Sequence, residues 1–210
     1  MQRILLVDDH AVVRRGVRSI LEDRLAGIEV VEAGNGDEAL AKLEPTFDAV
    51  VLDLSMPGRS GFDLLSEIKH REPKVPVLIM SLHAEDQYAV RALRAGASGY
   101  LTKSAAPEQL VAAVTKIMRG GRYVSDVVAE RLAAEAIGGA KATESKHERL
   151  SDREFDVMRG IASGSSVSEI AAQMHLSVKT VSTYRTRLLE KMGMSNNAEL
   201  TRYALEQGLV

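Results

Sequence analysis

Three carboxylates and one hydroxyl stand directly after short hydrophobic runs of the sequence, where a binding or reacting group would be presented. The carboxylates are Asp8, Asp9 and Asp53, and the hydroxyl belongs to Ser81. Carboxylates crowded into one place repel one another unless a cation lies between them. Oxygen ligands without His or Cys suit Mg²⁺, which often shares its coordination sphere with a phosphoryl oxygen. The pattern therefore predicts a Mg²⁺ site that handles phosphate.

Asp53 is the candidate nucleophile of this set. Carboxylates form aspartyl phosphates when a metal and a cation neutralise the incoming phosphoryl group. Lys103 can supply the cation, and the Ser81 hydroxyl can donate to the phosphoryl oxygens. A strand-terminal Asp is often only a helix cap or a turn former. That interpretation fits Asp8 or Asp53 alone, whereas the full set favours phosphoryl chemistry.

The elements that must position these residues alternate along the first half of the chain. Alternating strands and helices predict a parallel sheet with helices on both faces. The carboxyl ends of its strands form one edge, where ligands bind, so the acidic residues and Ser81 should meet there. The predicted strands are Ile4–Val7, Ile28–Glu32, Ala49–Leu52, Val77–Met80 and Gly99–Leu101, and the predicted helices are Ala11–Leu25, Asp37–Leu43, Phe62–His70, Glu85–Ala95 and Pro107–Met118.

The pattern changes after residue 120. Residues 121–147 are rich in small and polar residues and predict a linker that is helical around Val127–Ile137. Four helix starts follow, three of them Ser or Asn with Glu three residues later. We therefore predict three parts, residues 1–120, 121–147 and 148–210, of which the last is an all-α four-helix module containing a helix-turn-helix.

The third helix of that module, Val178–Met192, has a polar and cationic outer face. Segment Ser177–Lys191 holds four basic residues against Glu190, although Lys+Arg and Asp+Glu balance at eight each across 147–210. A local positive helix on a neutral domain is typical of a phosphate-binding surface, and a solvated amphipathic helix is the alternative. The residues predicted to face the core are Val178, Val181, Leu188 and Leu189, and those predicted to project outward are Lys179, Ser182, Thr183, Thr186 and Arg187.

Composition excludes several functional classes. The chain has 27 Lys+Arg against 29 Asp+Glu, so nucleic-acid binding must be local rather than global. It has no Cys, which removes disulfides, thiolate zinc sites and iron–sulfur clusters. Its longest apolar stretches fall far below the roughly 18 residues that span a bilayer. We expect a soluble, cytoplasmic protein with no membrane partner.

Several short motifs of the first half occur in a specific order. They are Leu6-Val7-Asp8-Asp9-His10, Val51-Leu52-Asp53-Leu54-Ser55-Met56-Pro57-Gly58 with Gly61, Ser81, Gly96-Ala97, and Gly99-Tyr100-Leu101 with Lys103. Together they resemble the receiver domain of two-component response regulators, over about residues 1–120. The resemblance implies a flavodoxin-like, doubly wound α/β fold with a five-stranded parallel sheet in the order 2-1-3-4-5.

The receiver resemblance also assigns the acidic residues. It implies that Asp53 is the phosphoacceptor and that a sensor histidine kinase supplies the phosphoryl group. Asp9 and Asp53 would be direct Mg²⁺ ligands, and the Ser55 backbone carbonyl would be the third protein ligand. Asp8 would act mostly through a metal-bound water.

Three further residues match the switch machinery of receivers. Ser81 and Tyr100 correspond to the switch pair, in which the hydroxyl moves to the phosphoryl group and the ring turns inward. Lys103 corresponds to the phosphate-sensing lysine. Many receivers have Pro after that lysine, whereas this chain has Ser104, and a cis peptide bond without Pro costs roughly 3 kcal/mol.

Motifs of the last 60 residues resemble the DNA-binding domain of NarL/LuxR-type (NarL/FixJ) regulators. They are Leu150-Ser151-Asp152-Arg153-Glu154, Ile170-Ala171, Leu176-Ser177-Val178-Lys179-Thr180-Val181 and Leu188-Leu189-Glu190-Lys191-Met192-Gly193. The resemblance implies a scaffold helix over Val167–Met174, a recognition helix over Val178–Met192 in the major groove, and a helix over Ala198–Gln207 that pairs in a DNA-bound dimer.

By matching position, the resemblance divides the recognition helix into two groups of DNA contacts. The residues nearest the base edges would be Ser182, Thr183 and Thr186, and those nearer the phosphates would be Lys179, Thr180, Arg185 and Arg187. Tyr184 stands where many relatives have His. Hydroxyl groups discriminate bases less sharply than a bidentate Arg or Asn, so we expect dimer spacing and DNA shape to contribute to specificity.

These features predict a transcription regulator, not an enzyme. Phosphorylation of Asp53 would control its binding to double-stranded promoter DNA, with a homodimer forming on phosphorylation or on DNA binding. One alternative is a Mg²⁺-dependent phosphohydrolase with Asp53 as nucleophile, although such enzymes usually carry a second acid soon after the nucleophile, where Leu54 and Ser55 stand here. Another alternative is a phosphorylation-independent DNA-binding regulator with a vestigial receiver.

Overall fold

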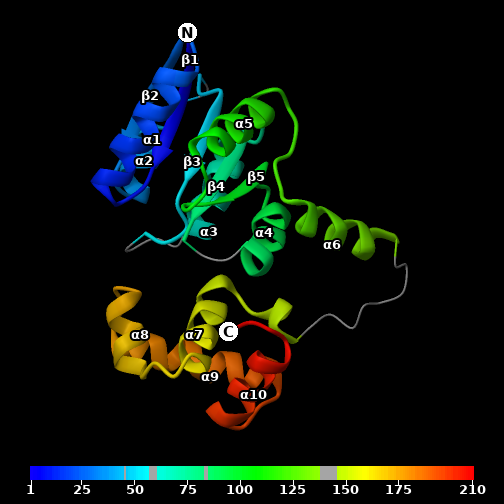
Figure 1. Ribbon diagram of the computed structural model, residues 1–210. Helices are drawn as coiled ribbons and strands as arrows, with labels where there is room; N and C mark the ends of the chain where they lie inside the picture. Colours follow the sequence, from blue (N-terminus) through cyan, green and yellow to red (C-terminus); the bar gives the residue numbers. More distant parts are fainter. Residues whose placement is uncertain (45, 57–60, 83–84, 138–145) are drawn as a thin grey trace. The chain divides into compact units, whose positions relative to one another are not determined.

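The computed structural model describes residues 1–44, 46–56, 61–82, 85–137 and 146–210 (Figure 1). Contacts divide the chain into two compact units, Met1–Ala134 and Glu135–Val210, which we call the N-terminal and C-terminal units. The domain boundaries at residues 120 and 147 stay predictions, and residues 138–145 of the predicted linker lie outside the described residues. Within the described ranges, no helix is both long and apolar enough to cross a membrane.

The N-terminal unit is built on a five-stranded parallel sheet whose order, β2-β1-β3-β4-β5, confirms the predicted fold. The central strands β3 and β4 are buried at every residue, whereas the edge strand β2 is partly buried. A parallel sheet covered on both faces requires such continuous hydrophobic runs. The strands are β1 (Gln2–Val7), β2 (Ile28–Ala33), β3 (Ala49–Leu52), β4 (Val77–Ser81) and β5 (Gly99–Thr102).

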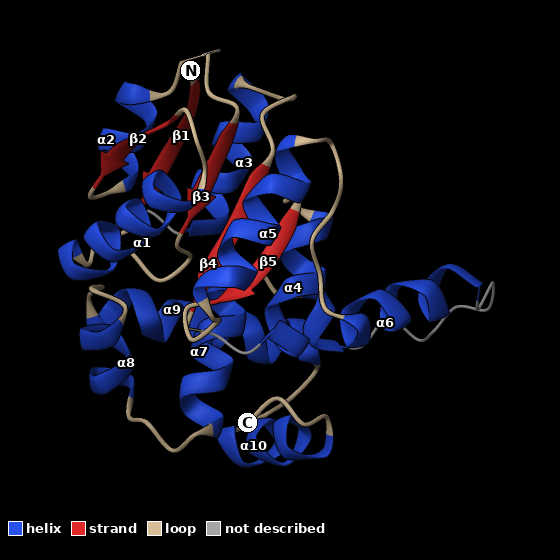
Figure 2. Ribbon diagram, turned by 45° about the horizontal axis from the view of Figure 1, so that its top comes forward, coloured by secondary structure: helices blue, strands red, loops and turns tan. Residues whose placement is uncertain are grey.

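Five helices cover the two faces of this sheet (Figure 2). Helices α1 and α5 pack on the face that includes Leu6, Val51 and Met80. Helices α2, α3 and α4 lie on the other face (Figure 2), where the Phe62 and Tyr88 rings stack with centroids 6.4 Å apart. Their bounds are α1 (Ala11–Arg24), α2 (Gly36–Lys42), α3 (Gly61–Arg71), α4 (Glu85–Arg94) and α5 (Pro107–Met118), each within one residue of the prediction at either end.

The segment predicted as linker begins as part of the N-terminal unit. Tyr123 N–H donates to the Ser98 carbonyl, and the Tyr123 carbonyl accepts from Tyr100 N–H, both at 3.0 Å. The backbone at Tyr123 approaches β5 closely, because a Cβ added to Gly99 would lie 2.7 Å from the Tyr123 carbonyl oxygen. Helix α6 (Asp126–Ile137) follows where the sequence predicted helical structure.

The C-terminal unit is a helical bundle whose helices begin at the predicted caps. The side chains of Ser151, Ser166, Ser177 and Asn196 each accept a backbone N–H three residues further on. Its elements are the short 3₁₀ helix η1 (Lys146–Arg149) and the helices α7 (Asp152–Ala162), α8 (Val167–Gln173), α9 (Val178–Met192) and α10 (Asn197–Glu206). These local hydrogen bonds satisfy backbone donors that helix starts leave unpaired.

A buried acid ties the first helix of the bundle to the third. Glu154 Oε2 accepts from Ser151 N–H at 2.8 Å and from Lys191 Nζ at 2.7 Å. Burial acts to raise the pKa of Glu154, but the hydrogen bonds from Lys191 and Ser151 outweigh it and lower the pKa. The same carboxylate therefore caps α7 and holds α9 against it.

Replacing Gly61 by Ala should destabilise the N-terminal unit. A Cβ at Gly61 would lie 2.4 Å from Leu54 Cα and 2.7 Å from its carbonyl oxygen, so backbone must move. Overpacking of this kind typically costs about 1–3 kcal/mol. Thermal unfolding of Gly61→Ala should show this loss. The matched control is Gly16→Ala in α1, where the added methyl meets nothing within 4 Å and should stabilise the helix by about 0.5–1 kcal/mol. Equal melting temperatures for the two variants would contradict the packing argument.

Replacing Glu154 by Gln should lower stability in a pH-dependent way. Because folding lowers the pKa of Glu154, its ionised form stabilises the fold above the ordinary value of 4.5, and this contribution disappears as the pH falls through the lower folded pKa. Denaturant unfolding should show Glu154→Gln to be about 1 kcal/mol less stable at pH 7, with the difference shrinking below pH 4.5.

The exposed acid Glu206, 3.9 Å from Arg202, provides a control for the Glu154 variant. Glu206→Gln should change stability by a few tenths of a kcal/mol at most. A stability difference between Glu154→Gln and the wild type that does not change with pH would show that the ion pair with Lys191 contributes nothing.

Candidate functional site

The parallel sheet brings the predicted carboxylates together at one edge. Asp8 follows β1 and Asp53 follows β3, the neighbouring strand, and Asp53 N–H donates to the Val7 carbonyl at 2.9 Å. Both carboxylates are fully buried, and that of Asp9 is partly exposed. One ligand atom from each of Asp8, Asp9, His10 and Asp53 lies within 4.8 Å of the others. The edge thus forms the acidic cluster that the sequence predicted.

Lys103, which follows the edge strand β5, also reaches this cluster. Its Nζ lies 2.6 Å from Asp8 Oδ2 and 2.7 Å from Asp53 Oδ2, and its side chain is only 6% exposed. Burial acts to lower the pKa of Lys103, but its close contacts with the Asp53 and Asp8 carboxylates outweigh it and raise the pKa. Burial raises the pKa of Asp53, against the opposing effects of Lys103 and the Ser55 N–H. The cation and both acids therefore form one coupled, buried group.

The other predicted residues of this edge, Ser55, Ser81 and Tyr100, follow β3 or belong to β4 and β5. Ser55 N–H donates to Asp53 Oδ1 at 2.9 Å, and this hydrogen bond orients the Asp53 carboxylate. Ser81 ends β4, and its carbonyl accepts from Lys103 N–H at 2.8 Å. Both Ser81 and Tyr100 are fully buried. The peptide bonds of the described residues, including Lys103–Ser104, are trans. Pro57 and Gly58 of the receiver-like motif lie outside the described residues.

The buried carboxylate oxygens fit a divalent cation. Asp8 Oδ2 and Asp9 Oδ1 are buried without a well-directed hydrogen bond, although Lys103 Nζ lies 2.6 Å from the first and His10 Nδ1 2.8 Å from the second. Oxygen atoms from several carboxylates are ligands that Mg²⁺ prefers. The donor set therefore suits Mg²⁺.

His10 corrects the prediction of a site without histidine. The oxygen-only donor set left it out, yet its ring reaches the Asp9 carboxylate. His10 is the N-cap residue of α1, and its own N–H donates to Asp8 Oδ1 at 2.7 Å. The signal that was available in the sequence is its position directly after Asp9.

The predicted DNA-contacting residues lie on α9 of the C-terminal unit. Five of them are exposed and two, Thr180 and Arg185, are half-buried; the exposed ones are Lys179, Ser182, Thr183, Thr186 and Arg187. Val181, Leu188 and Leu189 are buried as predicted. Val178 was wrongly predicted to face the core and is 50% exposed. It is the first residue of α9, and the helix is buried only from the next turn onward.

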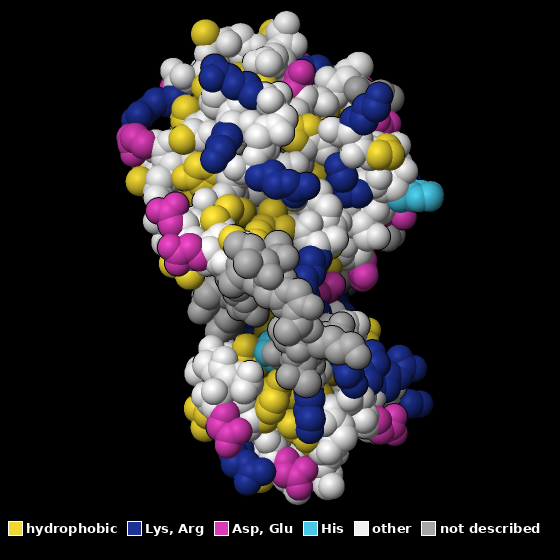
Figure 3. Space-filling model, turned by 90° about the vertical axis from the view of Figure 1, so that its right-hand side faces the viewer, with side chains coloured by type: hydrophobic (Ala, Val, Ile, Leu, Met, Phe, Trp, Pro, Cys, Tyr) yellow, Lys and Arg dark blue, Asp and Glu magenta, His cyan; other side chains and the backbone are white. Residues whose placement is uncertain are grey.

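Hydrogen bonds distinguish the polar residues of α9 from one another. The Thr183 and Thr186 hydroxyls donate to carbonyls one turn earlier, at 3.0 and 3.1 Å, so they offer acceptor lone pairs to a ligand. Arg185 Nε donates to Asn197 Oδ1 at 2.7 Å, which ties α9 to the start of α10. On the face drawn in Figure 3, Lys and Arg side chains gather at one edge of the C-terminal unit. On α9 itself, the exposed hydroxyls of Thr183 and Thr186 stand in the same helix as the exposed cations Lys179 and Arg187.

Comparison with known protein families assigns both halves of the chain. Residues 4–115 match the model of the response regulator receiver domain. Residues 148–204 match the model described as bacterial regulatory proteins, luxR family. The first match contains the acidic cluster and Lys103, and the second contains all of α9.

Similar proteins share this two-part organisation. The response regulator UvrY of Escherichia coli K12 is 39% identical over all of this chain and 96% of its own. The response regulator GacA of Pseudomonas aeruginosa is 35% identical over all of this chain and 98% of its own. The structure of RcsB from Salmonella enterica serovar Typhimurium, bound to promoter rprA with the phosphomimetic BeF₃⁻, is 27% identical with a TM-score of 0.60, covering 97% of this chain and 98% of that one. The chain therefore belongs to the two-component response regulators of the NarL/LuxR family and is a DNA-binding transcription regulator.

Proposed function

We propose that Asp53 is the phosphoacceptor and that its phosphorylation by a sensor histidine kinase controls DNA binding through α9. The observation that carries this proposal is the position of Lys103 Nζ, within 2.7 Å of both the Asp8 and the Asp53 carboxylates. An ammonium group held there pairs with the carboxylate before phosphorylation and can pair with the phosphoryl oxygens after it. Buried charged side chains gathered at the sheet edge where ligands bind support a functional site there.

The transfer follows from this arrangement. An Asp53 oxygen attacks the phosphorus of a phosphohistidine, the new O–P bond forms, and the N–P bond breaks with its electron pair returning to the imidazole. Asp9, Asp53 and the Ser55 carbonyl would hold Mg²⁺, with Asp8 acting through a water. When bound, Mg²⁺ neutralises charge on the phosphoryl oxygens. Lys103 supplies the second positive charge and Ser55 N–H orients the acceptor carboxylate.

The response to phosphorylation would be a two-state switch. The acyl phosphate places extra negative charge at the edge, and Lys103 and the Ser81 hydroxyl would close on it. Lys103 and Ser81 are already joined through the backbone, and Tyr100 lies buried on β5 beside β4. The face formed by α4, β5 and α5 would change and thereby free the recognition helix, favour a homodimer, or do both.

The DNA-bound form would be a dimer with α9 in the major groove of promoter DNA and α10 pairing across the two-fold axis. Ser182, Thr183 and Thr186 would face base edges. Lys179, Thr180, Arg185 and Arg187 would lie nearer phosphates. The solved structure of RcsB bound to promoter rprA in the presence of a phosphomimetic supports promoter DNA as the ligand.

Replacing Asp53 by Asn should abolish phosphorylation. Mass spectrometry after incubation with Mg²⁺ and acetyl phosphate should find one phosphoryl adduct on the wild type and none on Asp53→Asn, because the amide is not a nucleophile. Asp63→Asn, at an exposed carboxylate in the first turn of α3, is the control and should be phosphorylated normally. An adduct that persists on Asp53→Asn would place the acceptor elsewhere.

Two further measurements, with a small phosphate ester and with a phosphorylated kinase as donors, test the other functions. Sustained, Asp53-dependent release of phosphate from a small phosphate ester would identify a phosphohydrolase. No adduct with either acetyl phosphate or a phosphorylated kinase would identify a regulator that works without phosphorylation.

Two substitutions on α9 should separate phosphate contacts from base contacts. Arg187→Ala should weaken binding to all sequences alike and reduce the slope of log affinity against log salt by about 1, because one counterion-releasing contact is lost. Ser182→Ala should leave that slope unchanged and reduce discrimination between selected and random duplexes by about fivefold. Fluorescence anisotropy over a salt series measures both quantities.

Arg119→Ala is the control for charge, since it removes an exposed cation from the N-terminal unit. It should change neither the salt slope nor the discrimination. An Arg187→Ala slope equal to that of the wild type would contradict the assignment of this residue to a phosphate.

A further inference from the structure

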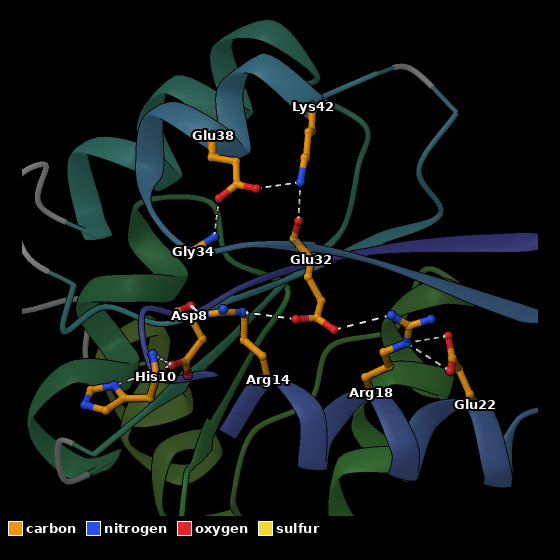
Figure 4. Close-up of polar contacts among 9 residues, drawn as sticks. All are labelled: Asp8, His10, Arg14, Arg18, Glu22, Glu32, Gly34, Glu38 and Lys42. Carbon is orange, nitrogen blue, oxygen red and sulfur yellow. Dashed lines mark hydrogen bonds and ion pairs between the residues drawn. The ribbon is translucent and has the colours of Figure 1, made fainter. Parts of the chain in front are cut away.

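An arginine outside the predicted site contacts the backbone of the acidic edge. Arg14, on α1, donates from Nη1 to the Asp8 carbonyl oxygen at 2.6 Å. Its Nε donates to Glu32 Oε2, on β2, at 3.1 Å (Figure 4). The Arg14 side chain is only 18% exposed and that of Glu32 27%. The guanidinium is therefore held between a strand carboxylate and the backbone that carries the metal-binding acids.

This contact bears directly on the position of Asp9. The Asp8 carbonyl belongs to the planar peptide that joins Asp8 to Asp9, so a bond to its oxygen fixes the plane from which Asp9 departs. His10 N–H holds the Asp8 carboxylate at 2.7 Å, and Arg14 N–H donates to the His10 carbonyl at 3.0 Å. Arg14 thus holds the acidic turn through both its backbone and its side chain.

Glu32 is itself held in place, so it can orient the guanidinium. Its backbone carbonyl accepts from Lys42 Nζ at 2.7 Å, and Lys42 also binds Glu38 Oε1 at 2.6 Å. Its second carboxylate oxygen lies 3.4 Å from Arg18 Nη1. Figure 4 shows these residues of α1, β2 and α2 in one connected network. With Nε bound to Glu32, the planar guanidinium is already oriented, so its bond to the Asp8 carbonyl costs little side-chain freedom.

We propose that Arg14, oriented by Glu32, is a positioning residue for the Mg²⁺-binding carboxylates, an inference that rests on the proposed function of the acidic edge. Arg14 touches neither the ion nor the phosphoryl group. It holds the Asp8–Asp9 peptide so that the carboxylates converge, and its charge offsets part of their mutual repulsion. Removal of such outer partners typically costs 10–100-fold in metal affinity.

The test measures binding of a metal rather than phosphorylation. Mn²⁺ takes the same oxygen ligands as Mg²⁺, and its free concentration is read from its electron paramagnetic resonance signal. Arg14→Met should weaken Mn²⁺ binding about tenfold relative to the full-length wild type. Arg14→Lys, which keeps the charge but cannot donate as a planar fork, should recover part of that loss.

Arg24→Met is the matched control, because Arg24 is the last residue of α1 and pairs with Glu108. It should bind Mn²⁺ within twofold of the wild type. Glu32→Gln should weaken binding about threefold in the wild-type background and add no further loss to Arg14→Met, because Glu32 acts through Arg14. Circular dichroism identifies a temperature at which each variant is folded, and Mn²⁺ binding is measured there. If Arg14→Met does not fold, the Mn²⁺ affinity of Arg14→Lys is compared with that of the wild type instead.

The outcomes separate this inference from the proposed function. A wild type that binds Mn²⁺, loses it in Asp9→Asn and keeps it unchanged in Arg14→Met and Arg14→Lys would overturn the positioning role alone. An equal loss in Arg24→Met would also overturn it, since the loss of any ion pair on α1 would then weaken metal binding. A wild type that binds no Mn²⁺ would overturn both the metal site and this inference.

Discussion

Two buried carboxylates at neighbouring strand ends need a compensating charge, and much of the N-terminal unit is arranged to supply it. Asp8 and Asp53 are both buried. Like charges repel each other more strongly in the protein interior than in water. Lys103 reaches both of them from beyond β5, which requires β1, β3, β4 and β5 to lie side by side in a parallel sheet. A buried charge without its partner typically costs 3–5 kcal/mol. The balance of charge at this edge therefore depends on the whole sheet.

The same dependence would make the edge responsive to a phosphoryl group on Asp53. A phosphoryl group on Asp53 would change the charge that Lys103 must balance. Lys103 is hydrogen-bonded through its backbone to Ser81. Tyr100 pairs with Ile79 earlier along the same two strands, β5 and β4, so a shift of the lysine would reach both strands. On the opposite side, the Asp8 carbonyl is held by Arg14 and Glu32. The Asp8 side of the edge is therefore fixed by Arg14 and Glu32, and the Lys103 side is connected to β4 and β5, the strands proposed to switch.

In the C-terminal unit, one side of α9 packs against the bundle and the other carries the proposed DNA contacts. Val181, Leu188 and Leu189 bury one side of α9, and the Glu154–Lys191 pair holds its later turns to α7. The opposite side carries exposed hydroxyls and cations. This division lets recognition residues vary with little effect on packing, because surface substitutions usually change stability by less than 0.5 kcal/mol.

Local patterns in the sequence were enough to predict the strands, the helices and their caps, because hydrophobic periodicity and a Ser or Asn three residues before Glu act within one element. The set Asp8, Asp9, Asp53, Ser81 and Lys103 followed from the places of these residues after successive predicted strands. The order of the strands came from the resemblance to a known family. Tertiary structure alone decided that His10 joins the acids, that Arg14 pairs with Glu32, and that Tyr123 extends the sheet edge. It also exposed Val178, which helical periodicity had placed in the core. Each of these depends on which atoms from different elements approach one another, and periodicity within a segment carries no information about such distances.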